Sequence, residues 1–294
     1  MAAANGTGLT SNCERAAPTP GPSTVVSRRE VGTAALVAAG LLAVRPSFAL
    51  SNPPDVPATG PPDVPATGQR VRIAMLLYPG VTALDVVGPQ GLLAGLAPGS
   101  LYLVAQKPGP VSSDTGISLL ATTSFAECPA ELDVLFVPGG DGTPAQMRDA
   151  ATLAFLRDRA SRARWVTSVC TGSLILGAAG LLAGYRATSH WCVRDTVLPL
   201  LGATPVDERV VFDRNRVTAA GISAGLDFAL ALSARLRGEA YARTAQLVAE
   251  YAPQPPFDAG SPAAAGPATT REAMVILGDL VIAAEGAAKA LRLR

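Results

Sequence analysis

Residues 165–173 read WVTSVCTGS, a buried-strand pattern followed by a cysteine and by small residues that suit the start of a helix. A cysteine between a strand and a helix projects from a tight turn at the end of a sheet, as the nucleophile does in hydrolases. The helix N-terminus carries partial positive charge, so we expect a lowered pKa and a reactive thiolate at Cys170. Thr171, Gly172 and Ser173 are small enough to let strand and helix pack closely. A free cysteine is usually an inert core residue, but this context favours a nucleophile.

Similar apolar runs alternate with helix-like segments over residues 69–262, which we expect to form one domain. Buried strands are expected at 71–78, 101–105, 132–137 and 165–169. Helices are expected at 82–96, 149–163, 171–183, 192–201 and 222–250, and short strand-like pieces at 109–125 and 186–189. A hairpin is expected where 209–212 and 216–218 flank a turn at 213–215. This alternation predicts an α/β fold with a mostly parallel sheet, helices on both faces and ligands at the carboxyl ends of the strands.

Two further motifs follow predicted strands. Pro138-Gly139-Gly140 ends the strand at 132–137, and glycines there let the backbone approach a bound atom. Gly139 and Gly140 are therefore candidates for an oxyanion and substrate-binding site, with a plain turn as the alternative. Asp85 lies among apolar neighbours just past the first strand; burial would raise its pKa and suit it to proton transfer. A helix N-cap explains Asp85 equally well.

His190 is the one histidine of the chain. It could assist Cys170 or satisfy a hydrogen bond in the core, and the twenty residues between them favour the structural role. A zinc site from Cys170, His190 and Cys192 is conceivable, but the spacing matches no tetrahedral pattern. Cys128 and Cys192 look like ordinary small apolar residues. The sequence has no Walker loop, no dinucleotide glycine fingerprint and no serine elbow, and we expect no metal or cofactor.

The amino-terminal part has a different character from the domain. A twin-arginine pattern at 27–31 precedes a mild apolar run at 32–44, a positive charge at Arg45 and a small-x-small cleavage motif ending at Ala49. Residues 1–49 are therefore predicted to be a Tat-type signal for export to the periplasm. If the start codon lies too far upstream, the protein is instead cytoplasmic.

Residues 50–68 contain the stretch PPDVPATG twice in succession. Proline at this density favours extended polyproline II and predicts a linker. The far end of the chain, 263–294, reads as a Pro/Ala-rich linker and a helix that packs on the domain or on a partner subunit.

The composition indicates which classes of binding partner to expect. Hydrophobic residues make up 49% and charged residues 16%, which provides for a sizeable core and argues against disorder. The net charge of +1 gives no support for nucleic-acid binding. The apolar run at 32–44 is too short to span a bilayer, so we expect no stable membrane insertion after signal cleavage. A small-molecule substrate is the remaining expectation.

Five stretches resemble the ThiJ/PfpI superfamily, whose fold is similar to that of class I glutamine amidotransferases, a flavodoxin-like three-layer sandwich. They are Leu84-Asp85 with Gly88-Pro89, then FVPGG at 136–140, SVCTGS at 168–173, ATSHW at 187–191 and EYAPQPPFDAGSP at 250–262. The aspartate and the late proline-rich stretch are similar to the isocyanide hydratase branch. That resemblance implies Cys170 as nucleophile, Asp85 as general acid/base and Thr171 as a neighbouring group at the elbow, which is also a candidate for the oxyanion and substrate-binding site. It further implies conversion of an isocyanide and water to an N-substituted formamide, no cofactor and a homodimer.

The position two residues after Pro89 is acidic in that branch and is Gly91 here, so Asp85 would act alone. Three other functions remain open. The same cysteine could serve a glyoxalase- or deglycase-like activity on reactive carbonyls, or a redox sensor that forms a sulfinic acid. Similar domains also form the ligand-sensing half of AraC-type regulators, which carry about a hundred further residues with a helix-turn-helix.

Overall fold

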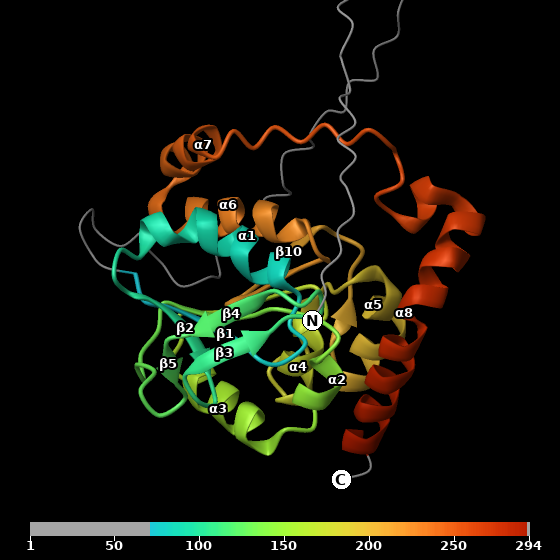
Figure 1. Cartoon of the computed structure of the whole chain (residues 1–294), viewed down its shortest axis with the longest axis horizontal. Coiled ribbons are helices and arrows are strands. Elements are labelled where there is room, and N and C mark those ends of the chain that lie inside the picture. Colours follow the sequence, from blue (N-terminus) through green and yellow to red (C-terminus); the bar gives the residue numbers. More distant parts are fainter. Residues whose placement is uncertain (1–70, 293–294) are drawn as a thin grey trace, which may run out of the picture. The chain divides into compact units, whose positions relative to one another are not determined.

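A seven-stranded sheet forms the centre of the computed structural model, which describes residues 71–292 (Figure 1). The strand order is β10-β11-β7-β6-β1-β2-β5, with every pair parallel except β10 and β11. The strands are β1 (Ile73–Leu76), β2 (Leu101–Ala105), β5 (Thr123–Ser124), β6 (Val134–Val137), β7 (Trp165–Val169), β10 (Val210–Asp213) and β11 (Arg216–Ala219). The predicted α/β fold with a mostly parallel sheet is confirmed. The signal and linker predicted at 1–49 and 50–68 lie outside the described residues.

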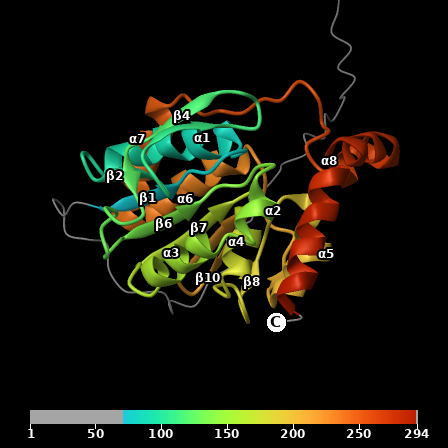
Figure 2. The same ribbon diagram turned by 60° about the horizontal axis from the view of Figure 1, so that its bottom comes forward.

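Helices cover both faces of this sheet, which makes the domain a three-layer sandwich (Figures 1 and 2). On one face α1 (Ala83–Leu93) packs against α6 (Ala224–Arg237), and α7 (Glu239–Val248) packs on α6. On the other face α3 (Ala150–Ala160) packs against α4 (Gly172–Ala178). Two shorter helices, α2 (Thr143–Gln146) and α5 (Trp191–Val197), lie at the carboxyl side of the strands.

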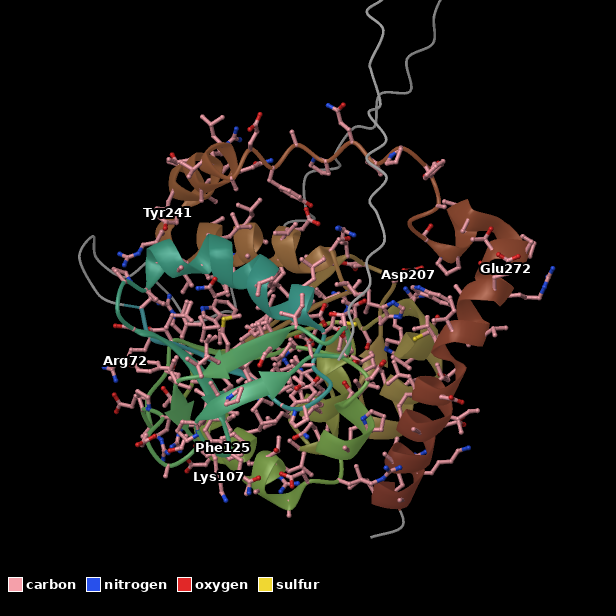
Figure 3. All side chains as sticks on the ribbon, in the orientation of Figure 1. Arg72, Lys107, Phe125, Asp207, Tyr241 and Glu272 are labelled. Carbon is pink, nitrogen blue, oxygen red and sulfur yellow. The ribbon has the colours of Figure 1, made fainter. Side chains whose placement is uncertain are left out.

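The central strands are apolar in sequence because they lie in the interior of the domain. Every residue of β1, β6 and β7 is buried, because each strand has neighbours on both sides and helices on both faces. Side chains crowd the interior, whereas charged side chains such as Arg72, Lys107 and Glu272 point outward at the periphery (Figure 3). A rigid core of this kind holds the strand ends, and the loops that follow them, in fixed positions.

Several element boundaries differ from the sequence-based expectation. The segment expected as a strand at 186–189 forms the short β8 (Arg186–Ala187), which pairs with β9 (Thr204–Pro205) apart from the main sheet. The pieces within 109–125 form the hairpin of β3 (Gly109–Ser112) and β4 (Ser118–Ala121), followed by β5. The helix expected at 222–250 is broken into α6 and α7 at Gly238, whose φ of 88° is outside the helical range.

The C-terminal helix begins earlier than expected. Helix α8 runs from Pro262 to Arg292 with one non-helical residue, Gly266, so much of the expected linker is helical. Its Ala284, Ala287 and Ala288 are fully buried, and it packs along α5 and α2. These small side chains let the helices approach closely, and α8 is thereby part of this domain. Among residues 71–292, none of the helices has the length and apolar character needed to cross a membrane.

Candidate active site

Cys170 occupies a strained elbow between β7 and α4. Its φ of 58° lies in the left-handed region, which costs a residue with a side chain roughly 1–2 kcal/mol. The Cys170 N–H donates to the Ala219 carbonyl at 3.1 Å, and this bond to the end of β11 holds the turn. A Cβ on Gly139 would lie 2.9 Å from Cys170 Cβ and 2.5 Å from Thr171 N, so only glycine allows this approach. The elbow predicted at this position is present.

Asp85 lies in the first turn of α1 and is fully buried. The Gly139 N–H donates to its Oδ2 at 2.9 Å, while Oδ1 has no hydrogen-bond partner among the described residues. The helix N-cap is Thr82, so the N-cap explanation of Asp85 is wrong. Burial raises the pKa of Asp85 to about 7, and hydrogen bonds with Gly139 and Cys170 partly oppose that rise. The carboxyl therefore faces the thiol and exchanges its proton near neutral pH.

The sequence predicted a thiolate at Cys170, but in the folded site the thiol keeps its proton. Burial, followed by the charge of Asp85, raises the pKa of the Cys170 thiol well above its ordinary range. The Thr171 N–H opposes this rise, but a helix of seven residues does not outweigh the loss of solvation. The resting cysteine holds its proton, and Asp85 is the adjacent base that can remove it.

The backbone donors expected to form an oxyanion site are already engaged. The Gly139 N–H donates to Asp85, and the Gly140 N–H donates to Thr171 Oγ1 at 3.0 Å. Gly140 has a φ of 141°, and a Cβ there would lie 2.3 Å from the Gly80 carbonyl oxygen. These two glycines hold the acid and the elbow in place, and the role of free oxyanion donor assigned to them from the sequence does not fit.

Thr171 belongs to a buried chain of hydroxyl groups that the sequence analysis missed. Thr171 Oγ1 lies 2.7 Å from Thr143 Oγ1, which lies 3.3 Å from the Tyr78 hydroxyl; Tyr78 in turn donates to the Pro138 carbonyl at 2.8 Å. Because Gly140 can only donate and Pro138 can only accept, all four bonds run in one direction. Thr171 is thus held by its neighbours and supports the elbow. Tyr78 and Thr143 come just after β1 and β6, so the rule that parallel sheets place sites at strand ends could have found them.

His190 lies close to Cys170 despite its separation in sequence. It is the N-cap of α5, where Nδ1 accepts from the Cys192 N–H at 3.4 Å and lies 3.0 Å from Cys192 Sγ. A Cβ on Gly221 would lie 2.2 Å from His190 Cδ2 and 3.0 Å from Cys170 Sγ, so imidazole and thiol flank the same glycine. Burial lowers the pKa of His190 to about 4, which keeps the ring neutral. Sequence distance is a poor guide here, because the Ser189 hydroxyl donates to the Cys170 carbonyl at 3.1 Å and holds this segment against the elbow.

Comparison with known proteins gives a consistent picture. Residues 71–235 match the DJ-1/PfpI family. The chain belongs to the DJ-1/PfpI family. It is 53% identical over 203 residues to the isonitrile hydratase of Pseudomonas putida, covering 69% of this chain and 88% of the relative. It is also similar to a deglycase of Pyrococcus horikoshii, at 29% identity over 40% of this chain and 72% of the relative.

Among solved structures, a ThiJ/PfpI family protein from Pseudomonas syringae superposes with a TM-score of 0.72. It is 49% identical in sequence, and the match covers 79% of this chain and 98% of that one. The predicted resemblance to the ThiJ/PfpI superfamily is confirmed. No group of three His, Cys, Asp or Glu residues within 71–292 is placed to hold a metal ion, so the zinc arrangement considered from the sequence does not form.

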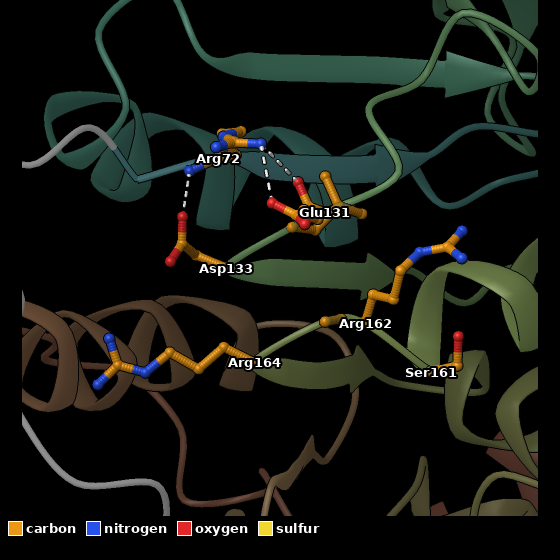
Figure 4. Close-up of a pocket in the computed structure, with 8 residues that line it drawn as sticks. Arg72, Glu131, Asp133, Ser161, Arg162 and Arg164 are labelled. Atoms are coloured by element: carbon orange, nitrogen blue, oxygen red, sulfur yellow. Dashed lines mark hydrogen bonds and ion pairs between the residues drawn. The ribbon is translucent and has the colours of Figure 1, made fainter.

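A hollow in this DJ-1/PfpI domain lies at the amino ends of the strands, away from the elbow (Figure 4). It has a volume of about 510 Å³ and lies where residues just before β1, β6 and β7 meet. The Arg72 N–H donates to Asp133 at 2.8 Å, and its guanidinium lies 3.9 Å from Glu131 (Figure 4). These charged groups line an open depression at the amino ends of the strands. The elbow is at the carboxyl ends, so we assign this hollow no part in the chemistry.

Replacing Gly221 with alanine is expected to lower kcat/KM by about 10–100-fold, because the new methyl group must displace the imidazole or the thiol. The free energy of unfolding should fall by roughly 1–3 kcal/mol. Steady-state kinetics and urea denaturation measure the two effects. Gly91→Ala is the matched control: nothing lies within 4 Å of its Cβ position in helix α1, so it should stabilise the fold slightly. An unchanged kcat/KM in Gly221→Ala would contradict the geometry.

Replacing Thr143 with valine is expected to destabilise the protein by roughly 1–3 kcal/mol, because the Thr171 hydroxyl then loses its acceptor in a buried site. Urea denaturation of Thr143→Val, Thr171→Val and the double variant measures the coupling between them. We expect the double variant to cost clearly less than the two single changes together. Strict additivity would show that the hydroxyl chain does not act as a unit.

Proposed function

We propose that this protein hydrates isocyanides to N-substituted formamides, with Cys170 as nucleophile and Asp85 as the group that moves the protons. The observation that carries this proposal is the buried pair itself: a protonated thiol facing a carboxyl whose pKa burial raises to about 7. The similarity to the isonitrile hydratase of Pseudomonas putida supports the choice of substrate class.

The first half of the reaction joins the cysteine to the substrate. The Asp85 carboxylate removes the proton from Cys170 Sγ as the sulfur attacks the terminal carbon of the isocyanide. That carbon gains a carbon–sulfur bond, and the proton now on Asp85 moves to it. The product is a thioimidate in which nitrogen is doubly bonded to a CH group that carries the cysteine sulfur. Asp85 is again a carboxylate at this point.

The second half releases the formamide. Water attacks the thioimidate carbon, and Asp85 accepts one of its protons and passes it to the nitrogen as the carbon–nitrogen double bond opens. The tetrahedral carbon then forms its carbonyl and expels the cysteine sulfur, and Asp85 transfers the hydroxyl proton of that carbon to the sulfur. Overall one water adds to one isocyanide, and no atom is left over. The same carboxyl serves as base and acid in both halves, which suits a group with a pKa near 7.

The buried state of Cys170 disfavours the redox-sensor alternative. Oxidation to a sulfinic acid proceeds through an accessible thiolate, and here burial keeps the thiol protonated. An isocyanide suits the pair, because its terminal carbon needs a proton in the first step and Asp85 can deliver it.

Purified full-length protein supplied with a simple alkyl isocyanide should yield the corresponding formamide, followed by ¹H NMR of the formyl proton. Cys128→Ala is the matched control, because Cys128 is a buried free cysteine packed beside Pro129 and Arg159 and outside the elbow. It should match the native rate. A folded native protein that yields no formamide would overturn the proposal and leave reactive carbonyls as the next substrates to test.

Export and assembly remain separate proposals. We propose that residues 1–49 are removed as a Tat-type signal, so that the enzyme acts in the periplasm, and that two copies associate. The twin-arginine pattern and cleavage motif support the first proposal, and the exposed apolar side chains Leu84 and Val87 on α1 support the second. Mass spectrometry of the mature amino terminus and light scattering test them.

A further inference from the structure

Hydrolysis of the thioimidate needs a hydrogen-bond donor that the elbow's glycines do not provide. Water must be held against the thioimidate carbon, and its oxygen becomes the formamide carbonyl oxygen. A donor directed at that oxygen stabilises it through both stages. The two backbone N–H groups nearest the elbow on the β6 side are bonded to Asp85 and Thr171. His190, whose ring borders the same glycine as the Cys170 thiol, is the side chain at the elbow that can supply a donor.

The surroundings of His190 fix which of its ring nitrogens carries the proton. Nδ1 accepts from the Cys192 N–H, and a backbone N–H can only donate. The nearby Cys192 thiol also keeps its proton, since burial raises its pKa to about 12, and it too faces Nδ1. Nδ1 is thus an acceptor without a proton. Because burial keeps the ring neutral, its single proton resides on Nε2.

The protonated nitrogen belongs to the ring that borders Gly221 beside the Cys170 thiol. A Cβ on Gly221 would lie 2.2 Å from His190 Cδ2, 3.1 Å from His190 Cγ and 3.0 Å from Cys170 Sγ, and Nε2 is the ring atom bonded to Cδ2. His190 is partly exposed, and no described group accepts the proton of Nε2. The Nε2–H is therefore free to donate to a substrate bound at Cys170.

We propose that the Nε2–H of His190 donates a hydrogen bond to the oxygen of the attacking water and then to the forming formamide carbonyl. This role rests on the proposed hydratase function and assigns a second polar group to its hydrolytic step. His190 remains neutral throughout and transfers no proton; Asp85 does that. Loss of one such donor lowers rates by about 10²–10³-fold in enzymes that form a comparable oxygen.

Two variants of His190 separate the donor role from the structural one. His190→Asn keeps a good N-cap for α5 but is too short to present a donor at the Nε2 position. His190→Gln loses the favoured cap but carries an N–H that reaches this position. We expect His190→Asn to retain its melting temperature and lose turnover by 10²-fold or more, with the thioimidate on Cys170 accumulating as a mass increase equal to one isocyanide. We expect His190→Gln to melt earlier yet keep more turnover. The reverse order of turnover would show that His190 only caps the helix.

The tautomer can be read without any substrate. His190 is the one histidine in the chain, so ¹⁵N-labelled protein gives a single set of imidazole signals. At pH 7 we expect a protonated Nε2 and an unprotonated Nδ1, and the Nε2 signal should shift when an N-alkyl formamide product is added. A proton on Nδ1 would overturn the inference and leave the hydratase proposal intact. Absence of turnover by the native enzyme would instead overturn the hydratase proposal, and the donor role with it.

Discussion

Replacement of Cys170 by alanine is expected to abolish isocyanide turnover, with a loss of about 10⁴-fold or more. The carbon–sulfur bond cannot form without the thiol, and no other described nucleophile faces Asp85: the nearby hydroxyls of Thr171 and Thr143 are bonded to one another. Serine is expected to fail nearly as completely. A hydroxyl is much harder to deprotonate than a thiol, and a carboxyl with a pKa of about 7 is too weak a base for it.

Formamide production and intact-protein mass spectrometry measure this loss directly. The native enzyme should show a transient mass increase on Cys170 at high isocyanide concentration, and Cys170→Ala should show none. Circular dichroism and urea denaturation should report a folded variant, because alanine fills most of the same buried space at the same backbone conformation. Residual turnover within tenfold of native would mean that another group initiates the reaction.

Replacement of Asp85 by asparagine is expected to reduce turnover by about 10²–10⁴-fold, because the group that takes the thiol proton is gone. The pH profile should change with it. In the native enzyme the rate should rise with pH through about 7 as Asp85 ionises while Cys170 keeps its proton. That limb should be absent from the residual activity of Asp85→Asn. A variant that retains the limb would assign it to a different group.

The same substitution is expected to change stability in the opposite direction. The pKa of Asp85 is about 7 in the folded state and near 3.8 in an unfolded chain, so between these values only the folded state holds the proton. Below about pH 4 the carboxyl is protonated in both states and the free energy of unfolding has its full value. This value decreases as the pH rises to about 7, where the folded state also releases the proton. At about 1.4 kcal/mol for each pH unit, this loss is roughly 4 kcal/mol by pH 8.

Asparagine carries no charge, so Asp85→Asn should flatten this slope and raise the free energy of unfolding at pH 8 by roughly 1–3 kcal/mol. The gain is smaller than the full loss because the buried amide N–H group lacks an evident acceptor. Urea denaturation of both proteins at pH 4 and pH 8 measures it. Equal pH slopes in the two proteins would mean that Asp85 is ionised at the same pH in the folded and unfolded states.

Asp85 is expected to support turnover and to lower the free energy of unfolding at neutral and higher pH. A buried carboxylate with one unpaired oxygen destabilises the fold, and destabilising groups of this kind are typical of active sites. The helix N-terminus behind Cys170 does not generate a standing thiolate. Reactivity arises when Asp85 takes the thiol proton, and a resting thiol of this kind is protected from reaction with other electrophiles.

Much of the fold followed from local pattern. The buried runs that became β1, β6 and β7, and the strand-cysteine-helix pattern at Cys170, were predicted because both depend on neighbouring residues alone. Element boundaries were predicted wrongly at Gly238, where one glycine separates α6 from α7, and at Pro262, where α8 begins within the expected linker. Site residues were found where a strand ended in a recognisable motif, and Tyr78 and Thr143 were missed because their one signal was a position after a strand, without a motif around it.

The sequence by itself determined the class of fold, the position of the elbow and a short set of polar residues near strand ends, since hydrophobic periodicity and turn-forming residues act over a few neighbours. Only the tertiary structure decided what those residues do. It buried Asp85 against Gly139, engaged the expected oxyanion donors, raised the pKa of Cys170 and placed His190 beside it. Each of these depends on which strands are adjacent in the sheet and on how much water is excluded between them. Hydrogen bonding and solvation are properties of the assembled site, and no stretch of sequence contains them.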